Sequence, residues 1–370
     1  MESLPVIVFK GILDLLLEPI DIVCLSFASK TLHALINHYK HTLNLRSNVV
    51  LTKKGESIFP LFLDLVMQRP DVDAAHFRTG IEMAFDNSFN DEIKPGDMPQ
   101  SVTSLTFGNN FNKPIAPGSL PESLMAITFG KLFNHPIAPG SLPGLLTSLT
   151  FGWLFDQAIA PGSLPGSLVE LTFGASFNKP LVYGMLPQSL ISLTFGVSYD
   201  TPIAPGSLPE SLTSLSLGYK FNQRIIHGSL PGSLTILSLG YLFNQDIDAE
   251  ALPSQLEVLR FKGIFNRPIP PGTLPRSLQT IQLSHDFNQQ MDIGTLPSSL
   301  TSLSVGYKFR HVLVPGALPS SLKELYHFSE LDTNILTKGV LPHSITKLTL
   351  GNNFKQPNPI AAHSLPRVAG

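Results

Sequence analysis

Apolar and turn-forming residues recur along most of this chain with a period of 22 residues. The unit is clearest in residues 120–141, which open with Leu-Pro and close with Pro-Gly-Ser. The same Leu-Pro pair returns, each time 22 residues further on, at Leu142, Leu164, Leu186, Leu208, Leu230, Leu252, Leu274, Leu296 and Leu318. A unit this short cannot bury its own apolar face and stacks on copies of itself, so the period predicts a solenoid.

Each unit contains a segment of the form Leu-x-x-Leu-x-Phe, for example residues 124–129. Two inward residues on either side of one outward residue are typical of a short strand, and stacked copies predict a parallel sheet. In the Gly-x-x-Phe-Asn that follows, we expect the Gly to supply an unusual backbone turn and the Phe to fill the core. The Asn can satisfy neighbouring backbone groups, and its recurrence in successive coils predicts a ladder.

The return path of each unit carries up to three prolines. Each proline removes a backbone donor and disfavours helix in the residue before it, so an α-helical back face is excluded. The predicted fold is mainly β: a leucine-rich-repeat-like parallel β solenoid of about 12 repeats over residues 80–370. A half-unit near residue 80 opens the array, and the repeat becomes irregular from about residue 326, as expected of a C-terminal cap.

The residues before position 80 follow a different pattern. Apolar residues at spacings of three and four predict two or three short helices over residues 5–36. Residues 37–79 are predicted to form a helical connector and N-terminal cap. So short a helical region cannot bury all of its apolar faces, which leaves surface for a partner. The alternative is that these helices only cover the open edge of the solenoid.

The order of residues in this helical region resembles an F-box, the module that docks on the adaptor Skp1 in cullin-based ubiquitin ligases. The resemblance covers residues 1–36 and rests on Leu4-Pro5, Ile12-Leu13 and the run from Leu17 to Lys30. It implies that a Skp1-like adaptor, and through it a cullin ligase, is a partner. The residues that the resemblance assigns to Skp1 binding are Leu4, Pro5, Ile12, Leu13, Leu16, Pro19, Ile22 and Leu25.

The repeat array is similar to the FNIP repeat family. The similarity rests on paired Pro-Ile and Pro-Gly-Ser-Leu-Pro segments and on Phe-Asn pairs that begin at Phe111, Phe133, Phe177, Phe221, Phe243, Phe265 and Phe287. An F-box followed by FNIP repeats is an arrangement known from social amoebae and from giant viruses of amoebae, so the resemblance implies a protein of that type.

Charge and cysteine content narrow the compartment and the partners. Charged residues make up 14% of the chain and the formal net charge is −2, which gives no electrostatic footprint for nucleic acid or an anionic membrane. The single cysteine, Cys24, excludes an internal disulfide framework. The sequence shows neither a signal peptide nor an apolar run long enough to span a bilayer. We expect a cytoplasmic protein, acting in the host cytoplasm if it is viral.

No sequence motif indicates catalysis, cofactor binding or metal binding. The sequence lacks a Gly-x-Ser-x-Gly elbow, a phosphate loop, a dinucleotide-binding glycine motif, a His-Glu-x-x-His pair and any paired cysteines. The protein is therefore predicted not to be an enzyme, and to have no cofactor, no catalytic residues and no metal site.

Large side chains on the variable, outward positions of the repeat are the candidates for target binding. Aromatic residues supply contact area at low entropic cost, so those that follow the repeat glycine are candidate anchors, together with one outward Arg on a strand. The candidates are Trp153, Tyr219, Tyr241, Tyr307 and Arg260. The alternative is that these rings lie flat over the neighbouring coil and seal the turn. The stacked Thr residues at the outward strand position, from Thr106 to Thr194, are interpreted as structural.

The sequence thus predicts a substrate-recognition subunit of a Skp1–cullin–F-box ubiquitin ligase, in which the helical region recruits Skp1 and the solenoid holds a target protein. A non-catalytic scaffold or decoy that recruits no ligase is the first alternative. A carbohydrate-binding or adhesive surface that uses the aromatic residues is the second.

Overall fold

The computed structural model describes residues 81–98, 100, 102–327 and 339–350. The chain divides into two compact units, residues 1–155 (unit 1) and 156–370 (unit 2), and each is described by itself. The predicted helices of residues 5–36 and of the connector lie outside the described residues, as does part of the predicted C-terminal cap. Within the described ranges the regular elements are all β-strands, and no helix there is long and apolar enough to cross a membrane.

Both units are parallel β solenoids built from one short strand per coil. Unit 1 carries β1 (Ile81–Ala84), β2 (Val102–Thr106), β3 (Ala126–Thr128) and β4 (Ser148–Thr150). Unit 2 carries β5 (Glu170–Thr172), β6 (Ser192–Thr194), β7 (Ser214–Ser216), β8 (Ile236–Ser238), β9 (Val258–Arg260), β10 (Thr280–Gln282), β11 (Ser302–Val305), β12 (Glu324–His327) and β13 (Lys347–Leu350).

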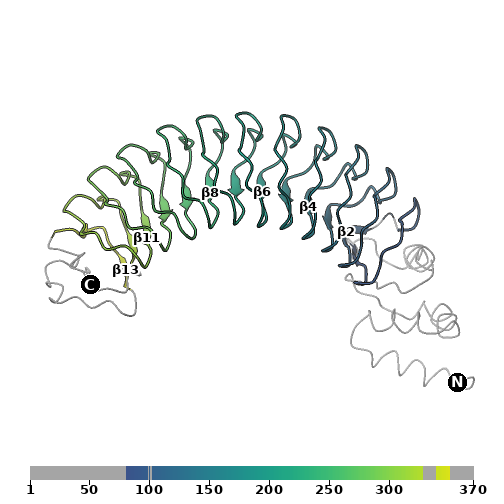
Figure 1. Ribbon diagram of the computed structural model, residues 1–370, viewed down its shortest axis with the longest axis horizontal. Helices are drawn as coiled ribbons and strands as arrows, with labels where there is room; N and C mark the ends of the chain where they lie inside the picture. The colour runs from purple at the N-terminus through teal and green to yellow at the C-terminus, as the bar shows by residue number, and fades with distance from the viewer. Residues whose placement is uncertain (1–80, 99, 101, 328–338, 351–370) are drawn as a thin grey trace, which may run out of the picture. The chain divides into compact units, whose positions relative to one another are not determined.

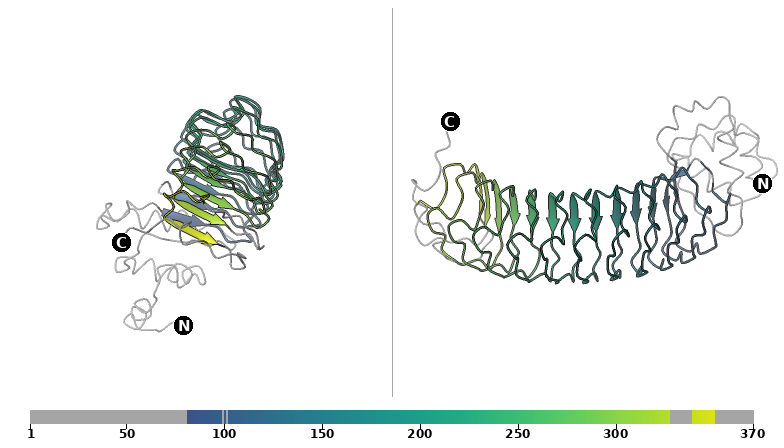
Figure 2. Two further views of the ribbon diagram at one scale, coloured as in Figure 1. Left: turned by 90° about the vertical axis from the view of Figure 1, so that its left-hand side faces the viewer. Right: turned by 90° about the horizontal axis from the view of Figure 1, so that it is seen from above.

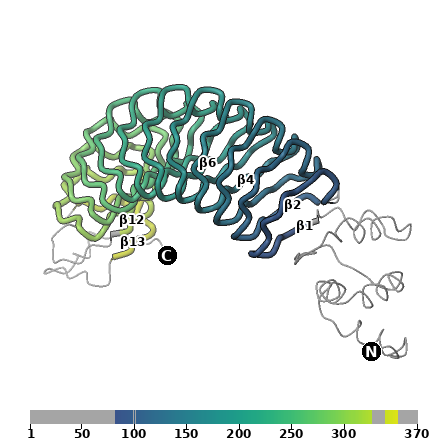
Figure 3. The backbone as a smooth tube through the Cα atoms, turned by 45° about the vertical axis from the view of Figure 1, so that its right-hand side comes forward, coloured from purple at the N-terminus to yellow at the C-terminus, as the bar shows by residue number. Residues whose placement is uncertain are grey.

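Consecutive strands pair in parallel within each unit, and most pairs keep the 22-residue register. In unit 1 Leu105 lies opposite Ile127, which lies opposite Leu149. In unit 2 the same column continues pair by pair from Leu171 to Leu348, with a 23-residue step at β12–β13. Figure 2 shows the strands of unit 2 pointing the same way, and in Figure 3 each of its coils repeats the path of the preceding one. The predicted parallel solenoid is confirmed for the described residues.

Phenylalanine fills the core of each coil in two stacked columns. Within one coil the ring of the Phe-Gly pair lies against that of the Phe-Asn pair, as with Phe129 and Phe133 at 3.9 Å between centroids. Between coils, rings of the Phe-Asn column repeat at about 6 Å and stay nearly parallel, for example 6.0 Å and 6° for Phe111 and Phe133. These side chains are essentially unexposed. Burying each one contributes about 2–3 kcal/mol, so the columns hold successive coils together.

Tyr199 takes one of the Phe positions in the second column. Its ring stacks on Phe177 and Phe221 at 6.2 and 6.0 Å. Its hydroxyl is buried and has no hydrogen-bond partner among the described residues; the hydroxyl of the nearby Thr201 bonds instead to the Lys179 carbonyl oxygen at 3.4 Å. Burial raises the pKa of Tyr199 to about 12, and Thr201 offsets a smaller part of the shift. The phenol therefore remains neutral at physiological pH.

The glycine of Gly-x-x-Phe-Asn has a different role from the predicted one. These glycines do not adopt positive φ angles, so they supply no unusual backbone turn. A Cβ atom on Gly240 would lie 2.0 Å from the carbonyl oxygen of Gly218 in the preceding coil. Glycine is needed there because successive backbones approach too closely for any side chain. In the Lys262-Gly263 coil the glycine is displaced by one residue and adopts a φ of 63°.

Positive φ angles are instead found at the Pro-Gly-Ser turn of the return path. Ten of its glycines in sequence-equivalent positions have this conformation, among them Gly206 at 74° and Gly228 at 79°. Glu250 occupies the same position and adopts a φ of 65°, the one non-glycine residue of the described chain with a positive φ. A side chain in this left-handed region is strained, so Glu250 marks a locally destabilised turn.

The predicted Asn ladder is present in both units. In unit 1 the backbone N–H of Asn112 donates to Oδ1 of Asn90 at 2.8 Å, and that of Asn134 donates to Oδ1 of Asn112 at 3.0 Å. In unit 2 the ladder runs from Asp156 to the backbone N–H of Arg310 with donor–acceptor distances of 2.8 to 3.0 Å. Aspartate substitutes for asparagine at two of its positions, since the ladder requires only the acceptor oxygen.

A second ladder was not predicted from the sequence. The Ser of Leu-Pro-x-Ser-Leu donates its hydroxyl to a backbone carbonyl of the preceding coil, as Ser211 does to Leu190 at 2.7 Å. The other members are Ser123, Ser189, Ser233, Ser277, Ser299, Ser321 and Ser344. The Ser ladder and the Asn ladder both tie coil to coil outside the strands.

Candidate interaction surface

The outward side chains of the strands form one continuous face in each unit. In unit 1 Thr106, Thr128 and Thr150 lie in register, as predicted for a stacked Thr column. In unit 2 the same position begins with Thr172 and Thr194 and then changes from coil to coil. Within unit 2 the strands lie along the inner side of the curve that its coils describe (Figure 1). The varied half of this face is therefore the part able to distinguish one partner from another.

Two of the predicted anchors lie together. The rings of Tyr219 and Tyr241 stack with 4.7 Å between centroids and 4° between planes. Both side chains remain nearly half exposed, at 47% and 43%. Backbone N–H groups of the residues that follow them bond to the preceding coil, as Leu242 does to the Tyr219 carbonyl at 2.9 Å, and these bonds fix the turns that carry the rings.

The Tyr241 ring also covers the next coil. A Cβ atom on Gly263 would lie 2.5 Å from Cγ of Tyr241, so the ring rests directly on that glycine. The alternative interpretation, in which a ring lies flat and seals the neighbouring turn, is therefore correct for one face of Tyr241. The outer faces of the tyrosine pair remain available as a flat aromatic platform.

Cationic side chains border this platform. Arg260 lies at the outward position of β9, in register with Ser238 of β8, and is partly exposed. Lys262 follows two residues later and is exposed, because it takes the position of the repeat glycine. Lys220, next to Tyr219, is exposed as well. No ion pair is recorded for these three cations within the described ranges, so the platform has a positive edge.

The remaining candidates are not part of this group. Tyr307 is 44% exposed and meets the imidazole of His285 edge-on at 5.0 Å, further along unit 2. Trp153 belongs to unit 1 and is 57% exposed. The structure therefore brings Tyr219, Tyr241 and Arg260 near one another, and it places Tyr307 and Trp153 elsewhere.

Tyr326 on β12 takes part in a local polar cluster that the sequence did not indicate. Its hydroxyl donates to Oε2 of Glu324 at 3.3 Å, and Nζ of Lys347 lies 5.1 Å from its ring centroid. Hydrogen bonding and attraction to Tyr326 hold the pKa of Lys347 above its usual value. These groups satisfy one another and show no sign of a reactive centre.

Within the residues that the structure describes, no group of three or more His, Cys, Asp or Glu side chains could hold a metal ion. A leucine-rich-repeat-like solenoid of this kind is typical of non-enzymatic interaction proteins. The arrangement is suited to binding a macromolecule along a stacked surface.

Comparison with known proteins gives matches to the repeats and to the fold. The sequence profile of the FNIP Repeat matches residues 89–132, 133–176, 177–220, 221–263, 265–308, 287–326 and 334–367. CroV588, whose crystal structure is described as a novel circular LRR protein structure, is 40% identical with a TM-score of 0.71. The match covers 75% of this chain and 41% of CroV588, so the chain spans less than half of that protein's length.

Two further solved structures match at lower identity. An internalin (inlF) from Listeria monocytogenes str. 4b F2365 is 14% identical with a TM-score of 0.48, and the match covers 86% of this chain and 85% of the internalin. A chain of the Toll–Spatzle complex of Drosophila is 16% identical with a TM-score of 0.45, covering 83% of this chain and 37% of that chain. A search of curated proteins found no match.

Proposed function

The chain belongs to the FNIP repeat family, and on this premise we propose that it is the substrate-recognition subunit of a Skp1–cullin–F-box type ubiquitin ligase. Its solenoid is a repeat-based protein-interaction surface. The observation that carries the ligase assignment is the order of residues in positions 1–36, which resembles an F-box and directly precedes the region that leads into the repeats.

The proposed mechanism is proximity. Leu4, Pro5 and Leu16, with the other residues that the F-box resemblance assigns, bind a Skp1-like adaptor, which links the chain to a cullin. The solenoid holds the target, and the transfer chemistry belongs to other subunits. This division of labour agrees with a sequence that carries no catalytic motif. We propose that this complex acts in the cytoplasm, the host cytoplasm if the protein is viral.

The target surface that we propose is the tyrosine platform with its cationic edge. The stacked Tyr219 and Tyr241 provide a rigid, amphipathic area, and Arg260 supplies a planar donor group beside it. Tyrosine and arginine are over-represented among residues that dominate binding energy at protein interfaces. Tyr307 and Trp153 would add contacts to a target that extends along the repeats.

The test is co-expression of the full chain with Skp1, followed by size-exclusion chromatography. The double variant Leu16→Glu, Leu25→Glu should lose co-elution, while its thermal transition stays at the wild-type temperature because the solenoid is untouched. The matched control is His38→Glu, at a position interpreted as surface. Co-elution of wild type and control, but not of the double variant, supports the ligase role.

Two outcomes would overturn it. If the folded wild-type chain does not co-elute, the scaffold or decoy function takes its place. If the double variant lowers the melting temperature of the repeats, the helical region is a cap of the solenoid rather than an adaptor-binding module.

A further inference from the structure

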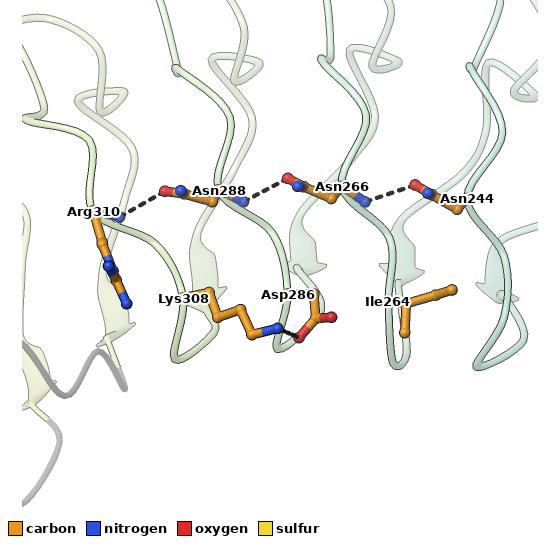
Figure 4. A pocket seen from close by; sticks show the side chains of 7 residues that line it. All are labelled: Asn244, Ile264, Asn266, Asp286, Asn288, Lys308 and Arg310. Atoms are coloured by element: carbon orange, nitrogen blue, oxygen red, sulfur yellow. Dashed lines mark hydrogen bonds and ion pairs between the residues drawn. The ribbon is translucent and has the colours of Figure 1, made fainter.

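An open groove of about 590 Å³ lies on the Asn ladder of unit 2, away from the tyrosine platform. Figure 4 shows its lining: Asn244, Asn266 and Asn288 form one row, and Arg310 continues that row at one end. Below the row lie Asp286 and Lys308. All of these residues come from four successive coils, so the groove follows the stacking direction. At about 4.8 Å per coil it is roughly 15 Å long.

The ladder fixes which way each asparagine amide is turned. Oδ1 of Asn244, Asn266 and Asn288 accepts the backbone N–H of the next coil at 2.9, 2.8 and 3.0 Å. Oδ1 of Asn266 accepts a second bond, from Nε2 of Gln289 at 3.0 Å. The oxygen of each amide is therefore occupied, and the Nδ2 group must face away from the ladder bond.

These Nδ2 groups have no recorded acceptor in the described part of unit 2. Three amide nitrogens thus stand in a row, one per coil, in side chains that line the groove. They offer hydrogen-bond donors and no free acceptor. A ligand that fits this row must itself be rich in acceptor oxygens.

The charged side chains of the groove point to the same class of ligand. Nζ of Lys308 pairs with Oδ1 of Asp286 at 3.0 Å, and the side chain of this lysine remains 61% exposed. Arg310 is exposed and has no ion pair recorded among the described residues. With one carboxylate against two cations, the groove has a net positive charge, and the guanidinium is the group best shaped to take a carboxylate in two parallel hydrogen bonds.

We propose that this groove binds an acidic segment of a protein, with side-chain carboxylates accepting from Arg310, from Lys308 and from the row of asparagine amides. A length of about 15 Å accommodates four to five extended residues. The choice of a peptide rests on the proposed function, in which the solenoid holds a target protein; the oxyanion specificity rests on the donors alone.

The test measures binding of the full chain, without Skp1, to a fluorescein-labelled peptide Gly-Glu-Glu-Glu-Glu-Gly by fluorescence polarisation. The matched probe replaces every Glu by Gln, and a third probe carries phosphoserine in place of Glu. We expect the Glu peptide to bind at least about tenfold more tightly than the Gln peptide, and its affinity to fall as salt is raised. Because no ligase component is present, failure of this test is separate from failure of the Skp1 experiment.

Ladder chemistry supplies a variant that changes the groove and leaves the fold intact. Asn288→Asp keeps the acceptor oxygen, as Asp200 does for the N–H of Asn222 at 2.8 Å, but it removes the amide donor and adds a negative charge. We expect it to bind the Glu peptide at least about tenfold more weakly. Asn222→Asp makes the same change on the same ladder outside the groove, and its affinity should stay within about twofold of wild type.

The charged residues give two further variants of opposite sign. Arg310→Gln should weaken binding by at least about tenfold, whereas Arg276→Gln, which removes an exposed cation outside the groove, should not. Asp286→Asn removes the groove's own carboxylate and should strengthen binding about threefold.

The proposal fails if the Gln peptide binds as tightly as the Glu peptide, or if Asn222→Asp and Arg276→Gln weaken binding as much as their groove counterparts. The second result would mean that general charge attraction suffices. Tight binding of the phosphoserine peptide without binding of the Glu peptide would overturn the carboxylate assignment and identify phosphate as the oxyanion.

Discussion

Replacing Gly240 by Ala tests the close approach of consecutive coils. The added Cβ would lie 2.0 Å from the carbonyl oxygen of Gly218 and 3.3 Å from that of Phe221. Ordinary contact begins at 3.4 Å, so the Gly218 carbonyl would have to move by about 1.4 Å. That carbonyl accepts the backbone N–H of Phe221 at 3.1 Å, and Phe221 is fully buried. The substitution therefore both crowds the coil and breaks a buried hydrogen bond.

The two costs can be added for an expected magnitude. Crowding a packed interior costs about 1–3 kcal/mol. Leaving a buried N–H without an acceptor costs about 1–3 kcal/mol. We expect Gly240→Ala to lower the free energy of unfolding by about 3–5 kcal/mol.

A matched substitution separates close approach from backbone conformation. Gly228 has a φ of 79°, but a Cβ there would meet only Pro205, at 3.6 Å. Gly228→Ala should therefore cost only the left-handed penalty of about 1–2 kcal/mol. Urea unfolding followed by circular dichroism gives both losses, and hydrogen exchange of the Phe221 amide localises the first. Equal losses for the two variants, or unchanged protection of the Phe221 amide in Gly240→Ala, would refute the steric argument.

Three other substitutions test the buried hydroxyl, the strained turn and the ladder. Tyr199→Phe removes an unpartnered buried hydroxyl and should stabilise the chain by about 1 kcal/mol in urea unfolding. Because the folded-state pKa of Tyr199 is raised to about 12, wild type should lose stability relative to this variant as the pH rises from about 10 to 12, where only the unfolded phenol ionises; parallel pH profiles would contradict this. Glu250→Gly relieves a φ of 65° and should raise stability by about 1 kcal/mol, whereas Glu210→Gly, on an exposed residue, should not; equal effects would exclude backbone strain as the cause. Asn266→Ala leaves the next coil's N–H without its acceptor and should cost about 1–3 kcal/mol, while Asn266→Asp should cost less than 1 kcal/mol; a similar loss for both variants would show that the ladder oxygen is not what matters.

The features that the sequence predicted correctly all depend on what recurs. The strand, the two phenylalanine columns and the Asn ladder each follow from a residue type that returns every 22 positions. Such regularity reveals which side chains share a face, because equivalent positions of a solenoid stack on one another.

The features that it missed depend on distances between coils. Periodicity gives the same weight to the glycine beside a carbonyl and to the glycine in a left-handed turn, so Gly240 and Gly228 could not be told apart. The Ser hydroxyls that bond across coils recur as regularly as the Asn residues, but the small polar residue was read as part of a turn. Both errors come from treating a unit in isolation.

The candidate surface was predicted in part for the same reason. The variable positions identified Tyr219 and Tyr241, but the contact of the Tyr241 ring with Gly263 depends on a displaced glycine in the next coil. The groove was missed altogether. Its signal was present in the sequence as Arg310, which interrupts the row of Asn residues, and as Lys308 and Asp286 exactly one period apart.

The spacing of the inter-coil bonds has a consequence for biosynthesis. Every ladder bond within either unit joins residues about 22 positions apart, so no contact of these ladders waits for a distant part of the chain. Low sequence separation favours rapid folding, which is unusual for a protein made of β-strands. A coil can therefore dock on its predecessor soon after it leaves the ribosome, and each unit can be completed from its N-terminal end while synthesis continues.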